Sequence, residues 1–350
     1  MLGQLLQTGV GALAWALGAL VLVAALLYLA RTALARWRRV RQFRGRVRAE
    51  DALKHVYKAR AAGERPTVES MAGSMQVSLN RAAQTVAGLQ KAELLTVGQE
   101  GMQLTPSGER YALNVIRAHR LWEQHLAEKT GVAEGEWHRR AEHQEHLISP
   151  EEADSLSAGL GHPTFDPHGD PIPGPRGDLP RMPDQRLSSL EPGRWARITH
   201  VEDEPEEIFA QIRAMGLAPG MRLRLLAKDP RRLRCWCDGE DHVLAPIVAS
   251  SLTVEPLPEA AGMAEAARPL WLSQLEPGRC GRVVRLSPRC RGAERRRLMD
   301  LGILPGTVIR SELRSPTGGL TAYRVRDTLI GLREDQAAQI QIEPLPESAS

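Results

Sequence analysis

The chain has 350 residues, of which 42% are hydrophobic and 25% are charged, and its formal net charge is +4. This length exceeds that of one average domain, so it excludes a single small core and predicts two or three separate ones. The charge is unevenly distributed along the chain. Residues 1–30 carry no charged side chain, whereas residues 31–48 carry eight arginines.

The uneven charge begins with an apolar run of 22 residues, from Gly9 to Ala30. About 20 helical residues cross a bilayer core of roughly 30 Å. A cleaved signal peptide has its basic residues before the apolar core, but here they follow it, which favours a retained anchor. A buried core helix is the alternative. We therefore expect an outer N-terminus over 1–8, a transmembrane helix over 9–30 and a basic juxtamembrane segment over 31–48.

Under this interpretation the chain is a single-pass protein of the inner membrane, and everything after the arginines faces the cytoplasm. Anionic lipid headgroups are then the expected partners of the arginines. The four cysteines, which form no CxxC pair, are interpreted as reduced and mostly structural thiols. They are Cys235, Cys237, Cys280 and Cys290.

A helix-turn-helix pattern with a wing spans residues 49–110. A first helix is followed by a short helix capped by Thr67 and, after a turn, by a longer helix capped by Ser78. Two short extended runs joined by a glycine-flanked turn come next, at residues 94–97 and 102–105. This order predicts a winged helix that enters a DNA groove.

Metal-ligating side chains then recur at helical spacing. His119 and Glu123 lie four residues apart on a predicted helix over 106–129, so they share a face. The next predicted helix carries four more at positions 0, +4, +7 and +8, namely His138, Glu142, Glu145 and His146. Two such helices can build a nitrogen and oxygen site for Mn²⁺ or Fe²⁺. A solvated helix face is the alternative, and the spacing alone does not decide between them.

A segment rich in proline and glycine over 161–184 ends the helical part, and the sequence beyond it repeats itself. Three strings recur at offsets of 85 to 88 residues. The matching ranges are 187–194 with 272–279, 215–220 with 301–306, and 254–259 with 342–347. We expect two copies of one small SH3-like β-barrel, over 185–259 and 270–346, joined by a linker over 260–269.

Several strings in residues 49–175 resemble the iron- and manganese-dependent repressors of the diphtheria toxin repressor family. They include Glu-Asp-x-Leu-x-x-x-Tyr at 50–57 and His-Arg-Leu-Trp-Glu at 119–123. Further matches are His-x-x-x-Glu-x-x-Glu-His at 138–146 and the segment from Gly161 to Gly174. The resemblance covers about 125 residues and implies a winged helix followed by a helical metal-binding and dimerisation domain, over 111–160.

The resemblance also implies two metal sites. The primary site takes Asp51, Glu142, Glu145 and His146, and an ancillary site takes His119, Glu123 and His138. Glu142 stands where the manganese sensors of the family have glutamate, whereas Lys54 is what the iron branch shows, so the ion is Fe²⁺ or Mn²⁺. No nucleophile and base accompany these ligands, and we expect no enzymatic activity.

The predicted reading helix offers four polar residues to the bases of double-stranded DNA, namely Asn80, Arg81, Gln84 and Thr85. Phosphate contacts are few there, because the helix has few cations and the wing tip carries Glu100. The two repeats resemble FeoA-type domains of ferrous-iron uptake systems. The first repeat contains an acidic run over 202–207, interpreted as a solvated loop or helix start, with a metal ligand as the alternative.

Two functions follow from these features. The first is a membrane-tethered, metal-dependent transcriptional regulator that binds operators of metal-transport genes as a homodimer. The alternative is a membrane-anchored FeoA-like accessory of a ferrous-iron transporter permease that has lost DNA binding.

Overall fold

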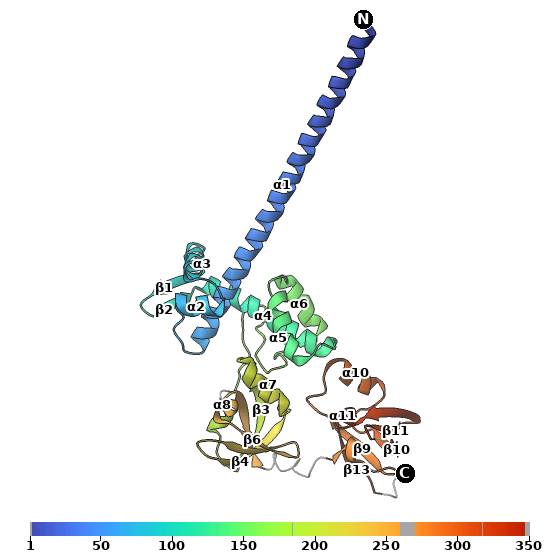
Figure 1. Cartoon of the computed structure of the whole chain (residues 1–350). Helices are drawn as coiled ribbons and strands as arrows, with labels where there is room; N and C mark the ends of the chain where they lie inside the picture. Colours follow the sequence, from blue (N-terminus) through green and yellow to red (C-terminus); the bar gives the residue numbers. More distant parts are fainter. Residues whose placement is uncertain (1, 184, 260–269, 317, 347–350) are drawn as a thin grey trace. The chain divides into compact units, whose positions relative to one another are not determined.

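The computed structural model describes the backbone of residues 2–183, 185–259, 270–316 and 318–346, and the side chains from residue 27 onward (Figure 1). The predicted linker over 260–269 lies outside the described residues. The chain divides into two compact units, Met1–Leu113 and Asn114–Ser350. Their positions relative to each other are not determined.

The first helix, α1, runs without a break from Leu2 to Ala61 and contains all eight arginines (Figure 1). In the part of the chain that the structure describes, no helix combines the length and the hydropathy that a membrane crossing requires. The side chains of residues 9–26 lie outside the described residues.

The predicted transmembrane helix over 9–30 is therefore wrong, and with it the single-pass location in the inner membrane and the juxtamembrane role of 31–48. The sequence argument weighed the apolar run and the arginines after it, but that run is part of a 60-residue helix that leads directly into the next domain. The alternative function, a membrane-anchored accessory of a transporter, assumed the same transmembrane helix, so its membrane anchor is wrong as well.

The rest of the first unit is a winged helix-turn-helix. Its elements are α2 (Val68–Ser74), α3 (Leu79–Lys91), β1 (Leu95–Gly98) and β2 (Gly101–Leu104), and the two strands pair antiparallel. Thr67 caps α2, and the Ser78 hydroxyl accepts a hydrogen bond from the Arg81 amide at the start of α3, as predicted. Leu53 of α1 packs with Met71, Val86 and Met102 in one core.

The helix α4 (Pro106–Lys129) starts in the first unit and continues into the second. It is followed by η1 (Glu134–Glu136), α5 (Trp137–Gln144) and α6 (Pro150–Gly159). Leu121 of α4 packs against Ala153 of α6 and Ile172 of the following segment. A second small cluster joins Leu126 and Trp137, which fixes the start of α5 against α4.

Two β-rich domains complete the second unit. The first contains η2 (Leu187–Ser189), β3 (Trp195–Val201), α7 (Glu206–Ala214), β4 (Arg222–Lys228), β5 (Leu233–Cys237), β6 (Glu240–Leu244), α8 (Pro246–Ser250) and β7 (Leu252–Leu257). Its antiparallel strands have the order β6-β5-β4-β3-β7.

The second β-rich domain contains β8 (Leu270–Trp271), η3 (Leu272–Gln274), β9 (Cys280–Leu286), α10 (Gly292–Asp300), β10 (Val308–Arg314), β11 (Leu320–Val325), β12 (Thr328–Arg333), α11 (Glu334–Ala337) and β13 (Ile340–Pro344). Its strands have the order β12-β11-β10-β9-β13-β8, which repeats the first domain with one added edge strand. Each domain encloses its own apolar core.

The repeated Pro-Gly strings have a structural reason. The Gly193 amide donates to the Leu225 carbonyl at 2.6 Å, and the Gly278 amide donates to the Ser311 carbonyl at 2.7 Å. These equivalent bonds tie the loop before the first long strand of each domain to the strand beside it. The four cysteines all lie in these two domains and are free thiols, as predicted.

Candidate metal centre

The centre of the candidate site is Glu123, which is 1% exposed on the inner face of α4. His119, one helical turn earlier, places its Nε2 atom 3.1 Å from Oε1 of Glu123. From α5, His138 places Nδ1 3.3 Å from the same oxygen. The predicted ancillary ligands His119, Glu123 and His138 therefore converge, with all three ligand atoms within 4.8 Å of one another.

A contact at the other ring nitrogen of His119, Nδ1, orients its imidazole ring. Its Nδ1 atom lies 2.5 Å from Oε2 of Glu145, which is also buried. A ligating histidine in proteins generally donates its second ring N–H to a carboxylate, and this fixes its tautomer. The Glu145 contact orients the ring so that Nε2 of His119 faces Oε1 of Glu123.

A third segment reaches Glu123 from the loop after α6. Asp166 and His168 lie beside Glu123, with ligand atoms again within 4.8 Å of one another, and all three are buried. Asp166 accepts hydrogen bonds from the amides of His168 and Asp170, at 2.8 and 2.9 Å, so the loop folds around it. Sequence reasoning gave Asp166 and His168 no role, although both lie in the segment from 161 to 174 that carries the family resemblance.

The loop that carries His168 is held tightly against β3. The Val201 amide donates to the His168 carbonyl at 2.8 Å. Gly169 has a φ of +92°, and a Cβ atom there would lie 2.0 Å from the carbonyl oxygen of Thr199. Only glycine fits this approach, so it fixes the distance between the loop and the first β-rich domain.

Asp203 brings a carboxylate to the cluster from the segment between β3 and α7. Its Oδ2 atom lies 3.0 Å from Nδ1 of His138 and 4.0 Å from Nδ1 of His168. Glu204 beside it reaches Nε2 of His138 at 3.5 Å. The acidic run of the first repeat, interpreted from the sequence as a solvated loop or helix start, thus faces the histidines of another domain.

The polar atoms around Glu123 fit a metal ion better than they fit one another. In the described part of the chain, several of them are buried and make no hydrogen bond. They are Oε1 of Glu123, Nδ1 of His138, Oδ2 of Asp166, and both ring nitrogens of His168. Buried polar atoms are rarely left without partners, because each costs about 1–3 kcal/mol. A divalent cation bound among them would satisfy these atoms together.

The electrostatics of the cluster show how strongly its charges interact. Burial raises the pKa of Glu123, but His119, His138 and His168 outweigh it and hold that pKa well below its usual range. Burial lowers the pKa of His138, yet its contacts with Asp203, Glu123 and Glu142 raise it to about 12. Burial raises the pKa of Asp166 well above its usual range, and the negative charges of Asp170 and Glu123 add to this shift.

The four predicted primary ligands do not all lie in the same unit. Nε2 of His146 lies 3.6 Å from Oε1 of Glu145, and both residues belong to the second unit. Glu142 is exposed and approaches Nε2 of His138 at 3.5 Å. Asp51 belongs to the first unit, whose position relative to the second is not determined. The primary site that combines all four stays a prediction.

The predicted base-reading residues lie on the outer side of α3. Asn80, Arg81 and Gln84 are exposed and Thr85 is half-buried, while Ala82 and Val86 between them face the core. Thr85 donates its hydroxyl hydrogen to the Arg81 carbonyl at 3.0 Å. The arrangement leaves the first two turns of α3 accessible to a partner.

The chain is similar to metal-dependent repressors in sequence and structure. Residues 105–174 match the metal-binding and dimerisation domain of iron-dependent repressors, and residues 185–256 and 271–344 match the FeoA domain. The iron-dependent repressor IdeR of Mycobacterium tuberculosis is 33% identical over 208 residues, which cover 55% of this chain and 90% of the relative. The diphtheria toxin repressor of Corynebacterium diphtheriae is 26% identical over 216 residues, which cover 59% and 95%.

Among solved structures, a manganese-dependent transcriptional repressor in complex with manganese has 30% sequence identity and a TM-score of 0.55. The similarity covers 60% of this chain and 100% of that one. The manganese regulator SloR has 27% identity and a TM-score of 0.52, covering 60% and 98%.

Proposed function

The chain belongs to the iron-dependent repressor family, which includes the diphtheria toxin repressor, and from this premise we propose that it is a metal-dependent, DNA-binding regulator of metal-ion homeostasis. Its activating ion is Fe²⁺ or Mn²⁺, the ions of its relatives. It binds operators of metal-transport genes as a homodimer, through the domain that matches the family's dimerisation domain.

The observation that carries this proposal is the buried Glu123 cluster. Three histidines and two further carboxylates surround one carboxylate from four segments of the second unit. Imidazole nitrogens and carboxylate oxygens without a thiolate suit Mn²⁺ and Fe²⁺. The residues that would hold the ion are His119, Glu123 and His138, and Asp166, His168 and Asp203 lie beside them.

The predicted primary ligands give the regulator its switch. Asp51 follows the arginine-rich part of α1, while Glu142, Glu145 and His146 lie at the end of the metal-binding helices. An ion that binds all four ties the DNA-reading unit to the second unit. Because the ion binds only one arrangement, it shifts the population of the protein towards that arrangement, which is the one that fits DNA.

The test is genome-wide DNA capture with the tagged full-length protein, in cells supplied with iron and manganese and in cells treated with a chelator. We expect metal-dependent peaks near metal-transport genes for the wild type. Glu123→Gln should lose these peaks, because it removes the central carboxylate with little change of shape. His143→Gln is the matched control, since His143 is exposed on α5. An identical capture pattern with and without metal would contradict the proposal.

A further inference from the structure

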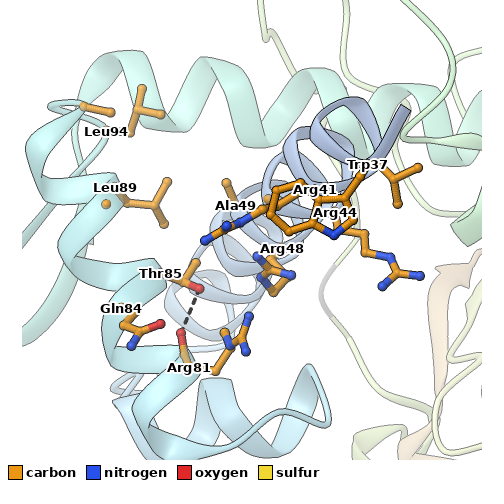
Figure 2. A pocket seen from close by; sticks show the side chains of 14 residues that line it. Trp37, Arg41, Arg44, Arg48, Ala49, Arg81, Gln84, Thr85, Leu89 and Leu94 are labelled. Atoms are coloured by element: carbon orange, nitrogen blue, oxygen red, sulfur yellow. Dashed lines mark hydrogen bonds between the residues drawn. The ribbon is translucent and has the colours of Figure 1, made fainter. Parts of the chain in front are cut away.

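A groove of about 590 Å³ lies in the first unit between α1 and α3 (Figure 2). One wall is formed by the part of α1 from Trp37 to Ala49, which precedes the winged helix in the sequence. The other wall is the face of α3 that carries Arg81, Gln84 and Thr85. The arginine-rich helix is thus placed beside the residues predicted to read DNA bases.

The arginines on the α1 wall share one helical face. Arg41, Arg44 and Arg48 follow at positions 0, +3 and +7, and all three line the groove (Figure 2). Arg81 adds a fourth cation from α3, and no acidic residue is among the described residues that line the groove. Four positive charges at one surface without a counter-charge favour an anionic partner.

Arg46, which lies on α1 between these arginines, has a carboxylate partner. Arg46 lies 3.6 Å from the Glu50 carboxylate, which also accepts a hydrogen bond from Tyr111. That cation is therefore paired with a carboxylate of its own helix. Arg41 instead lies over the ring of Trp37, with 5.3 Å between the guanidinium carbon and the ring centroid. This contact holds its side chain near the groove and leaves its N–H donors for a partner.

Each wall of the groove contains a glycine, which adds no side chain to it. Gly45 lies on α1 and Gly88 on α3, and a Cβ atom at either position would meet nothing within 4 Å. Neither glycine is therefore needed for the two helices to pack. Their absent side chains leave space between the arginines and the polar face of α3, which a chain of phosphates can occupy.

We propose that Arg41, Arg44 and Arg48 form a phosphate-binding face that holds the DNA backbone beside the bases contacted by α3. This inference rests on the proposed DNA-binding function and extends the interface into a part of α1 that precedes the winged helix. Duplex DNA is favoured over a lipid surface because the opposite wall presents Gln84 and Thr85, whose donors and acceptors match base edges. The face also supplies the cations that α3 itself lacks, since its own are Arg81 and Lys91.

The experiment compares two triple variants of the full-length protein on random-sequence duplex DNA, with Mn²⁺ present, over a range of salt concentrations. Arg41→Gln/Arg44→Gln/Arg48→Gln removes the proposed face. Arg36→Gln/Arg38→Gln/Arg39→Gln removes the same charge from the same helix at exposed positions that, among the described residues, do not line the groove. Thermal melting confirms that both variants fold.

Each contacted phosphate contributes about 0.9 to the slope of log affinity against log salt, so three contacts contribute roughly 3. We expect the groove variant to lose that much slope and on the order of 100-fold in affinity near 0.15 M salt. The control should change its slope by less than about 1. A third variant with lysine at all three groove positions should restore the slope, because it restores the charge.

Several results would overturn the inference. Equal salt slopes for the groove variant and the control would overturn it. Tighter DNA binding by the groove variant would also overturn it, because that result would mean that α1 obstructs DNA. Loss of binding to phosphatidylglycerol vesicles with unchanged DNA affinity would assign the face to lipid headgroups instead. Absence of Mn²⁺-dependent DNA binding in the wild type would overturn the proposed function as well, whereas the other results would leave that function intact.

Discussion

The two FeoA domains share one fold but use the segment after their first long strand in opposite ways. In the first domain this segment is acidic, and Asp203 reaches the histidines of the metal cluster. In the second it is basic, and Arg291 donates to the Pro167 carbonyl at 2.9 Å. Both segments therefore contact the helical domain or its connecting loop, but of the two only the first brings a carboxylate to the Glu123 cluster.

The second domain holds the end of α4 rather than the metal cluster. Arg296 of α10 donates to the Glu128 carbonyl at 2.6 Å, in the last turn of α4, where unpaired carbonyls carry partial negative charge. Gly292 at the start of α10 lies so close that a Cβ atom would be 2.7 Å from the Ala127 carbonyl oxygen. The first domain thus contacts the Glu123 cluster, whereas the second contacts the end of α4.

The largest expected effect of this difference is on metal affinity. Asp203→Asn should weaken Mn²⁺ binding roughly 10- to 100-fold, the usual effect of losing a carboxylate that contacts a ligating histidine. A competition assay against a fluorescent chelator measures it. Glu207→Gln is the control, because Glu207 belongs to the same acidic run but is exposed at the start of α7. Equal losses in the two variants would mean that the run acts through its overall charge.

The next effect is on the stability of the second domain's contact with α4. Gly292→Ala should destabilise the chain by about 2–3 kcal/mol, because alanine is strained at a φ of +58° and its Cβ meets two backbone carbonyl oxygens. Gly318→Ala is matched for backbone conformation, with a φ of +75°, but meets nothing within 4 Å. It should cost only about 1 kcal/mol. Differential scanning calorimetry compares them, and Mn²⁺ affinity should stay unchanged in both.

A smaller effect is expected at the end of α4. Arg296→Ala should cost about 0.3–1 kcal/mol, since an exposed cation at a helix C-terminus contributes that much and salt screens it. The difference from wild type in urea unfolding should shrink at high salt. An unchanged difference at 1 M salt would point to packing by the arginine side chain rather than to its charge.

The smallest effect concerns thiol reactivity, which also separates the two domains. Burial raises the pKa of Cys235 to about 12 and raises that of Cys237 as well, so neither forms the reactive thiolate near pH 8. Burial also raises the pKa of Cys290, to about 11, whereas Cys280 is partly exposed. Iodoacetamide at pH 8 should therefore label Cys280 first, as peptide mass mapping would show. Early labelling of Cys235 or Cys237 would contradict the burial of these two thiols in the core of the first domain.

Sequence reasoning found the parts of the site that lie within one helix. A spacing of four residues places His119 and Glu123 on one helix face, and the family resemblance assigns both to the ancillary site; the structure brings them together with His138. For the acidic run with Asp203, the sequence favours a solvated loop over a metal ligand, because the contact with His138 joins two domains and local spacing carries no information about such contacts. His168 was missed because its position depends on a tight loop against β3.

The same limit explains the errors and successes in the fold. The repeated Pro-Gly strings predicted two copies, and in both domains the string forms the same loop with an equivalent hydrogen bond to a neighbouring strand. The apolar run over 9–30 misled because hydropathy describes a segment and not the helix that contains it. The whole helix is 60 residues long, and three of its arginines, Arg41, Arg44 and Arg48, line the groove beside α3.

The central claim is that the Glu123 cluster binds a divalent cation, and a Mn²⁺ titration of the full-length chain tests it most directly. Electron paramagnetic resonance measures the free ion as protein is titrated with Mn²⁺. The wild type and His143→Gln should both bind Mn²⁺ tightly, and Glu123→Gln should lose one tightly bound ion per chain while retaining its fold. Equal Mn²⁺ stoichiometry and affinity in Glu123→Gln and the wild type would contradict the claim.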